Sequence, residues 1–166
     1  MSLYLSEFVY GGIDGIITTF SIVAGSSGGS LLRNVILILG LSNVVSDGFS
    51  MGVSRYVSSK TEIKQGFLKD KNPTISSIVT FVSFILVGIL PLLPFIFINN
   101  NSKNNQYTTY ISLSIALVVF FSIGYLKGIV VKEKNPYKSA FEILLLGLIA
   151  SLISYTIGKY TSKYIN

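Results

Sequence analysis

Five hydrophobic segments, each close to the length that crosses a bilayer, dominate this chain of 166 residues. A membrane-spanning helix needs about 20 consecutive, mostly apolar residues. Lipid offers the backbone no hydrogen-bond partners, so segments of this length that cross it fold as helices. The five segments cover residues 8–27, 34–56, 75–98, 108–131 and 139–160. We therefore predict an all-α integral membrane protein in which residues 1–166 form a single domain of five transmembrane helices.

Two local signals shape these helices. The sequence SSGGS at residues 26–30 is typical of a tight turn, so the first two spans should be antiparallel neighbours. Pro91 and Pro94 fall inside the third span. They should bend that helix or end it early, because proline lacks the backbone N–H that a helix interior uses.

The composition agrees with a membrane protein and excludes several kinds of chemistry. Charged residues make up 12% of the chain, about half the usual share of a soluble domain. The chain has no cysteine, which excludes disulfides, zinc fingers and thiolate catalysis, and no histidine, the commonest metal ligand. A bound metal would therefore need carboxylate, carbonyl, amide, hydroxyl or thioether ligands.

The basic residues are distributed unequally between the two sides of the predicted bundle. Nine of them lie in the loops on the side of the N-terminus and four on the opposite side. Cytoplasmic loops carry the excess of lysine and arginine, so the N-terminus should be cytoplasmic and the C-terminus lumenal or outside. Membrane orientation thus accounts for the net charge of +6, and no nucleic-acid partner is expected.

One face of the first span is small, polar and acidic, whereas its other faces are apolar. The residues of this face are separated alternately by four and three positions, which keeps them on one seam of a packed helix. The seam consists of Glu7, Gly11, Asp14, Thr18, Ser21, Gly25 and Gly28. A carboxylate inside a hydrophobic span is costly unless it faces a partner or water, so the seam indicates an ion or proton path.

The second span carries a polar stripe of its own. Asn43, Asp47 and Met51 are four residues apart and share one helix face. In an antiparallel hairpin, Asp47 should lie roughly level with Asp14, and Met51 with Glu7. Two carboxylates, an amide and a thioether could then converge at one depth. This mixture of hard oxygen and soft sulfur suits Fe²⁺ or Mn²⁺ better than Ca²⁺ or Mg²⁺.

Structural explanations compete with the functional one at several positions. A methionine in a span commonly fills the core, and glycines in a seam commonly only pack helices. Glu7 fits the membrane interface equally well. Asp14 and Asp47 are different, because two acids at membrane depth have no basic partner at their level in the same hairpin. Farther along the chain, Glu142 and Lys127 fit a structural ion pair across a short loop.

Two of these segments carry a resemblance to a known family. The sequences IDGIITTFSIVAGSSGG (13–29) and LILGLSNVVSDGFSMGVSRYVSSKTE (37–62) resemble the paired signatures of the vacuolar iron transporter family. Residues 72–95, 124–128 and 138–158 also fit, so the resemblance covers nearly the whole chain. It implies a five-span homodimer that moves Fe²⁺, and often Mn²⁺, out of the cytosol in exchange for protons. It also implies a vacuolar or other endomembrane in a eukaryote, and otherwise the plasma membrane.

The resemblance assigns roles to the polar residues. Asp14 would be the central metal ligand and the proton-coupling group, and Met51 the soft ligand that favours Fe²⁺ over Mg²⁺. The residues expected at the cytoplasmic entrance are Asp47, Asn43 and Glu7. The residues expected along the rest of the translocation path are Thr18, Ser21, Gly11 and Gly25. The metal would be cargo, so no resident cofactor and no enzymatic activity are expected.

The chain departs from the family pattern in one segment. Many members insert a cytoplasmic helical domain rich in glutamate and methionine between the second and third spans. Here that link, from Val57 to Pro73, has about 17 residues, and its acids are Glu62 and Asp70. The chain therefore resembles a short member without that metal-collecting domain. Position 43 is asparagine, where some relatives carry an acid.

Two other functions fit the same features. The polar seam could hold together a membrane assembly that transports nothing, or it could line a passive divalent-cation channel. Metal flux of any kind separates a transporter or channel from an assembly protein. Coupling to protons separates the transporter from the channel.

Overall fold

The computed structural model describes residues 4–67, 71–98 and 106–165, and these residues are helical apart from short turns and linkers. The helices are α1 (Leu5–Gly28), α2 (Arg33–Lys64), α3 (Pro73–Gly88), the 3₁₀ helix η1 (Leu90–Leu92), α4 (Leu93–Phe97), α5 (Gln106–Val130) and α6 (Pro136–Ile165). Five helical segments are long and apolar enough to cross a membrane, when α3 to α4 is taken as one. The prediction of an all-α protein with five membrane-spanning helices is confirmed.

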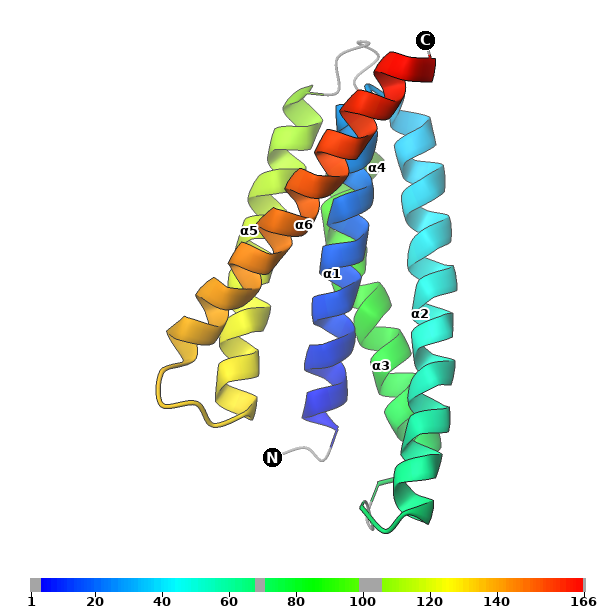
Figure 1. Ribbon diagram of the computed structural model, residues 1–166, viewed down its shortest axis with the longest axis vertical. Coiled ribbons are helices and arrows are strands. Elements are labelled where there is room, and N and C mark those ends of the chain that lie inside the picture. Colours follow the sequence, from blue (N-terminus) through cyan, green and yellow to red (C-terminus); the bar gives the residue numbers. More distant parts are fainter. Residues whose placement is uncertain (1–3, 68–70, 99–105, 166) are drawn as a thin grey trace.

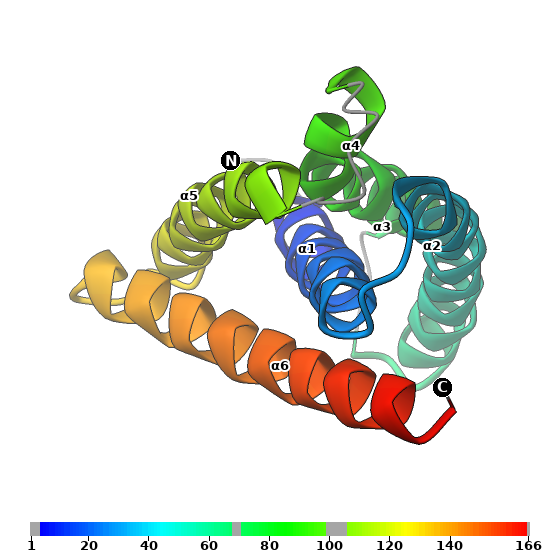
Figure 2. The same ribbon diagram turned by 90° about the horizontal axis from the view of Figure 1, so that it is seen from above.

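The α1 helix lies at the centre of the bundle (Figure 2). It packs chiefly against α3 and α6 and less closely against α5, whereas α2 packs mainly against α3. Apolar side chains of α1 and α5 meet in the core, where the rings of Phe20 and Phe120 contact edge to face with centroids 6.0 Å apart. The sequence neighbours α1 and α2 are antiparallel, as predicted (Figure 1). Their mutual contact is nevertheless small.

The third span bends at its prolines, as predicted. The α3 helix ends at Gly88, and η1 and α4 follow with Pro91 and Pro94 in their first turns. Other helices satisfy carbonyl groups of this irregular stretch: the buried hydroxyl of Ser112 donates to the Pro91 carbonyl at 2.6 Å. Arg33 donates to the last carbonyls of α4 through Nε and Nη2, at 2.6 and 3.1 Å. A cation there also complements the negative end of the helix dipole.

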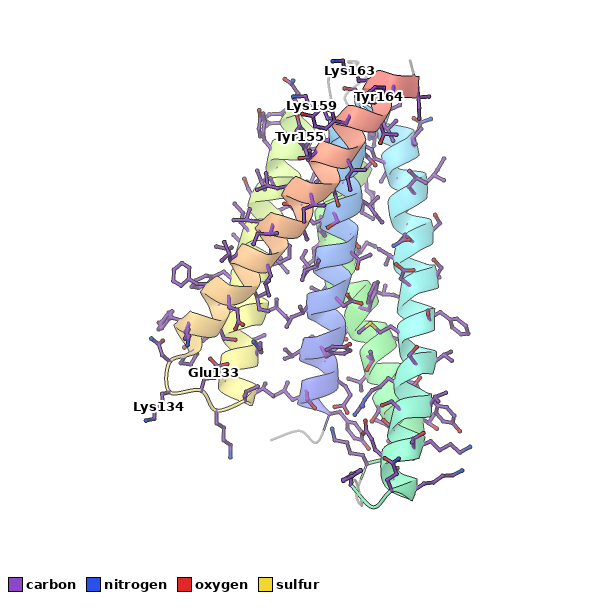
Figure 3. The ribbon with its side chains drawn as sticks, in the orientation of Figure 1. Glu133, Lys134, Tyr155, Lys159, Lys163 and Tyr164 are labelled. Atoms are coloured by element: carbon purple, nitrogen blue, oxygen red, sulfur yellow. The ribbon has the colours of Figure 1, made fainter. Side chains whose placement is uncertain are left out.

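The turns and chain ends divide between the two ends of the bundle, and basic residues lie at both. The N-terminal end of α1, the α2–α3 linker and the α5–α6 loop lie at one end, and the α1–α2 turn and the C-terminus at the other (Figure 1). Figure 3 shows Lys134 at the first end and Lys159 and Lys163 at the second. Two of the basic residues counted above, Lys69 and Lys103, lie outside the described residues. The side of the membrane on which each end lies stays a prediction.

The α2 helix extends beyond the predicted span. It continues to Lys64 rather than ending near residue 56, so the linker to α3 is only residues 65–72. Glu62 therefore lies on a helix instead of in a loop, and it pairs with Arg55 at 3.1 Å. The predicted ion pair between Lys127 and Glu142 is confirmed, at 3.1 Å.

Candidate metal path

The residues of the polar seam of α1 lie in two kinds of surroundings: some pack against other helices and others line cavities. A Cβ atom on Gly11 would overlap the Ser83 hydroxyl of α3 and lie 2.5 Å from the Thr80 carbonyl oxygen. A Cβ on Gly28 would overlap the Tyr155 carbonyl of α6. These two glycines therefore allow close helix contacts, the usual use of small residues between membrane helices. Between them, Asp14, Thr18 and Ser21 are half-buried and face open space.

One cavity, which we call the N-terminal cavity, opens between α1, α2 and the C-terminal end of α5, at the end of the bundle that carries the N-terminus. Its volume is about 800 Å³. Asp14 from α1 and Asp47 and Met51 from α2 all line it, together with the hydroxyls of Ser50 and Ser54. Helical spacing and the antiparallel hairpin thus bring the predicted carboxylates and the thioether to one cavity.

A second cavity, the C-terminal cavity, lies toward the opposite end of the bundle between α1, α2 and α6. Its volume is about 940 Å³. Hydroxyl groups dominate its polar lining, and they come from Thr18, Ser21, Ser26, Ser30, Ser154, Thr161 and Ser162. The predicted path residues Thr18, Ser21 and Gly25 line this cavity. Gly25 also approaches α6, since a Cβ there would lie 3.3 Å from the Ser154 carbonyl oxygen.

Asp47 lines both cavities. Its Oδ2 atom accepts a hydrogen bond of 2.6 Å from Nδ2 of Asn43, one helical turn away. The Asn43 side chain faces the C-terminal cavity. Because one amide hydrogen bond fixes the direction of the Asp47 carboxylate, Asn43 acts as an orienting partner whose own carbonyl oxygen remains a possible ligand. The two cavities therefore meet at an oriented carboxylate next to Asp14.

Glu7 is not an open carboxylate in this structure. Its side chain is only 2% exposed, and Oε1 accepts from Nη2 of Arg55 at 2.8 Å and from Nζ of Lys71 at 2.7 Å. Ser6 donates to the other oxygen at 2.8 Å. Glu7 still borders the N-terminal cavity, where it was predicted as an entrance ligand. The structure places it in an ion-pair cluster rather than beside Asp14 as a vacant ligand.

The ligand set of a single chain is small. Within the described part of the chain, no three acidic residues group together in a way that could hold a metal ion. Apart from the ion-paired Glu7 and the hydroxyl groups, the candidate ligands that line the N-terminal cavity are the carboxylates of Asp14 and Asp47 and the sulfur of Met51. Two carboxylates can balance the charge of a divalent cation, but three donors leave its coordination incomplete.

Sequence reasoning missed two contributions to these cavities. The first is the pair of cations that contact Glu7, which are Arg55 and Lys71. Arg55 entered the sequence argument only as one of the basic residues that predict membrane orientation, although Glu62 lies two turns along the same helix and pairs with it. The second is the polar edge of α6, where Ser154 and Thr161 border the C-terminal cavity. These two residues are seven positions apart, which puts them on one helix face. That spacing is a signal which periodicity could have found.

Comparisons with known proteins identify the family of this chain. The VIT family model matches residues 5–67 and 62–159. The chain is similar to the vacuolar iron transporter of Toxoplasma gondii, with 46% identity over 59 residues that span 36% of this chain and 20% of that protein. It is also similar to vacuolar iron transporter 1 of Oryza sativa, with 23% identity over 92% of this chain and 83% of the relative. The corresponding values for the Plasmodium falciparum vacuolar iron transporter are 24%, 93% and 81%.

These comparisons also bear on the segment between α2 and α3. The alignments with the Oryza sativa and Plasmodium falciparum proteins extend over 215 and 221 residues, more than the 166 of this chain. The relatives therefore contain inserted segments. The two parts of the family match meet at residues 62–67, where α2 ends and the short linker begins.

Proposed function

Because this chain belongs to the VIT family, we propose that it is a multi-pass membrane transporter that exports Fe²⁺, Mn²⁺ or both from the cytosol in exchange for protons. The relatives' names support a transporter of iron rather than an enzyme. The observation that carries the proposal is the position of Asp47 on both cavities, with Asp14 and Met51 beside it. Carboxylates at the junction of two cavities offer a cation one site that both ends of the bundle can reach.

The proposed roles follow from the chemistry of each group. Asp14 is the central ligand, because its half-buried carboxylate lines the N-terminal cavity together with Asp47 and Met51. Asp47, oriented by Asn43, passes the metal between the cavities, and Thr18 and Ser21 line the way out. A carboxylate must lose its proton to bind metal, so metal and proton compete for the same oxygen atoms. That competition is sufficient for an exchanger.

A homodimer would complete the ligand set. Three side-chain donors from one chain leave a divalent cation partly uncoordinated, and a two-fold axis beside α1 would supply the same donors again. We therefore propose that two copies pack with their N-terminal cavities facing each other. A monomeric mass for the purified, transport-active protein in lipid nanodiscs would contradict this assembly.

The test of the proposed function is metal uptake into proteoliposomes with a metal-sensitive dye inside. We expect the purified protein to move Mn²⁺ and Fe²⁺, and an opposing proton gradient to increase the rate. A metal flux whose rate does not depend on the proton gradient would contradict the exchange mechanism and favour a passive channel. No flux above that of empty liposomes would contradict transport and favour an assembly protein.

Met51 provides a sharper prediction about metal choice. Met51→Leu keeps an apolar side chain of similar volume, so folding should change little. Only the softer metal gains from a thioether ligand. We expect KM for Fe²⁺ to rise about fivefold, a loss of about 1 kcal/mol, with inhibition by Mg²⁺ unchanged. The measurement is Fe²⁺ uptake under reducing conditions with increasing Mg²⁺, and an unchanged KM would identify Met51 as a packing residue.

A further inference from the structure

Four charged side chains form a closed cluster at the mouth of the N-terminal cavity. Glu7 of α1 pairs with Arg55 of α2 and with Lys71 of the α2–α3 linker, and Arg55 pairs in turn with Glu62. The Ser58 hydroxyl donates to Glu62 at 2.8 Å. Two carboxylates and two cations sum to zero, so the connected cluster carries no net charge while Lys71 is in place.

Lys71 differs from Arg55 in how it is held. Arg55 is bound on two sides, by Glu7 and by Glu62, and its guanidinium has a fixed planar shape. Lys71 places a compact ammonium group on a flexible four-carbon chain. Its side chain donates to Glu7 and, at 3.3 Å, to the hydroxyl of Ser6. The lysine is therefore the member of the cluster that can leave with the least rearrangement.

The backbone beside Lys71 is fixed, so only its side chain needs to move. The Asn72 N–H donates to the Tyr4 hydroxyl at 3.0 Å, which ties the linker to the start of α1. The Asn72 side chain also caps α3 by accepting from the Thr74 N–H at 2.9 Å. These bonds keep the ammonium group close to Glu7 at a high effective concentration.

We propose that Lys71 is a tethered competitor for the Glu7 carboxylate, so that Glu7 receives a divalent cation only when that cation displaces Lys71. This inference rests on the proposed metal transport. Departure of the ammonium group leaves the cluster with one net negative charge next to the cavity that contains Asp14 and Asp47. A free monovalent cation carries the same charge as the Lys71 ammonium group but is not tethered near Glu7. It therefore competes poorly with Lys71 for the carboxylate. A divalent cation doubles the Coulomb attraction at the same distance.

Lys71 would thus help to set selectivity for divalent over monovalent cations at the entrance. This selectivity weakens the apparent affinity for the divalent cation. The apparent Kd equals the intrinsic Kd divided by the fraction of time during which Lys71 leaves the site open. If Lys71 is displaced for about a tenth of the time, removal of its charge should lower the apparent KM about tenfold.

The first test compares Mn²⁺ uptake by the wild-type protein, Lys71→Gln and Lys71→Arg. We expect Lys71→Gln to lower KM about tenfold, to keep kcat, and to make uptake sensitive to inhibition by K⁺. Lys71→Arg keeps the charge and should restore the KM and the K⁺ resistance of the wild type. The matched control is Lys64→Gln, which removes one exposed positive charge from the same end of the bundle and should change neither value.

An unchanged or increased KM in Lys71→Gln would overturn the proposal, since a lysine that only supports the fold would lower kcat or the folded yield instead. Absence of uptake by the wild-type protein would contradict the proposed transport rather than the competition. A second readout, which does not need transport, then decides. Mn²⁺ should increase acylation of the Lys71 amine, measured by mass spectrometry, without changing that of Lys64. Equal Lys71 labelling with and without Mn²⁺ would overturn the competition.

Discussion

Asp14→Asn is expected to abolish metal uptake while leaving the protein folded and inserted. The substitution removes one negative charge and keeps the shape of the side chain. A divalent cation in a membrane interior needs its charge balanced, because burial of an unpaired charge is strongly unfavourable. In this structure the balancing groups beside Met51 are the carboxylates of Asp14 and Asp47. Loss of one leaves the cation with a single negative partner per chain.

We expect the uptake rate to fall at least about a hundredfold. Removal of a group that only supports a metal ligand costs up to about that factor, and Asp14 is proposed to be a ligand itself. Mn²⁺ uptake into proteoliposomes measures this fall, normalised to the folded protein recovered by size-exclusion chromatography. Glu133→Gln is the matched control, since it removes a carboxylate charge from the α5–α6 loop (Figure 3), and Glu133 lines neither cavity. Wild-type uptake by Asp14→Asn would overturn the mechanism proposed for this site.

The sequence was sufficient to predict the membrane-spanning helices and the convergence of Asp14 and Asp47 on one cavity. Helical periodicity put Asp14 on one face of α1 and Asp47 and Met51 on one face of α2. The tight turn at residues 26–30 then fixed the antiparallel register of the two helices. Register along a hairpin depends on local geometry, so the depth of each group followed from counting residues. The structure places all three side chains on one cavity.

Long-range partners could not be predicted in the same way. Periodicity identifies a helix face but not the neighbour that the face meets, so Gly11 was grouped with the path although it packs against α3. The cations on Glu7 come from the far end of α2 and from the linker. Their positions depend on how far α2 continues past the membrane. The α2 helix ends at Lys64, eight residues beyond the predicted end of the span at residue 56.

The close contact of Gly11 with α3 leads to the second large effect. Gly11→Ala is expected to destabilise the fold by about 1–3 kcal/mol, the usual cost of forcing an extra carbon into a packed contact. The new Cβ would overlap the Ser83 hydroxyl and lie 2.5 Å from the Thr80 carbonyl oxygen, a backbone atom that cannot rotate away. Alanine also gains about 1 kcal/mol in helix propensity, so the strain must exceed that gain.

Thermal unfolding in detergent, followed by the loss of the folded peak in size-exclusion chromatography, measures the effect of Gly11→Ala. Gly29→Ala is the matched control: its Cβ would be 3.5 Å from the nearest atom, and its φ of −77° suits any residue, so its midpoint should stay near the wild type. If Gly11 lines the metal path instead, Gly11→Ala would leave the unfolding midpoint unchanged and reduce uptake. That outcome would contradict the close α1–α3 contact, because a side chain cannot enter that contact without displacing the α3 backbone.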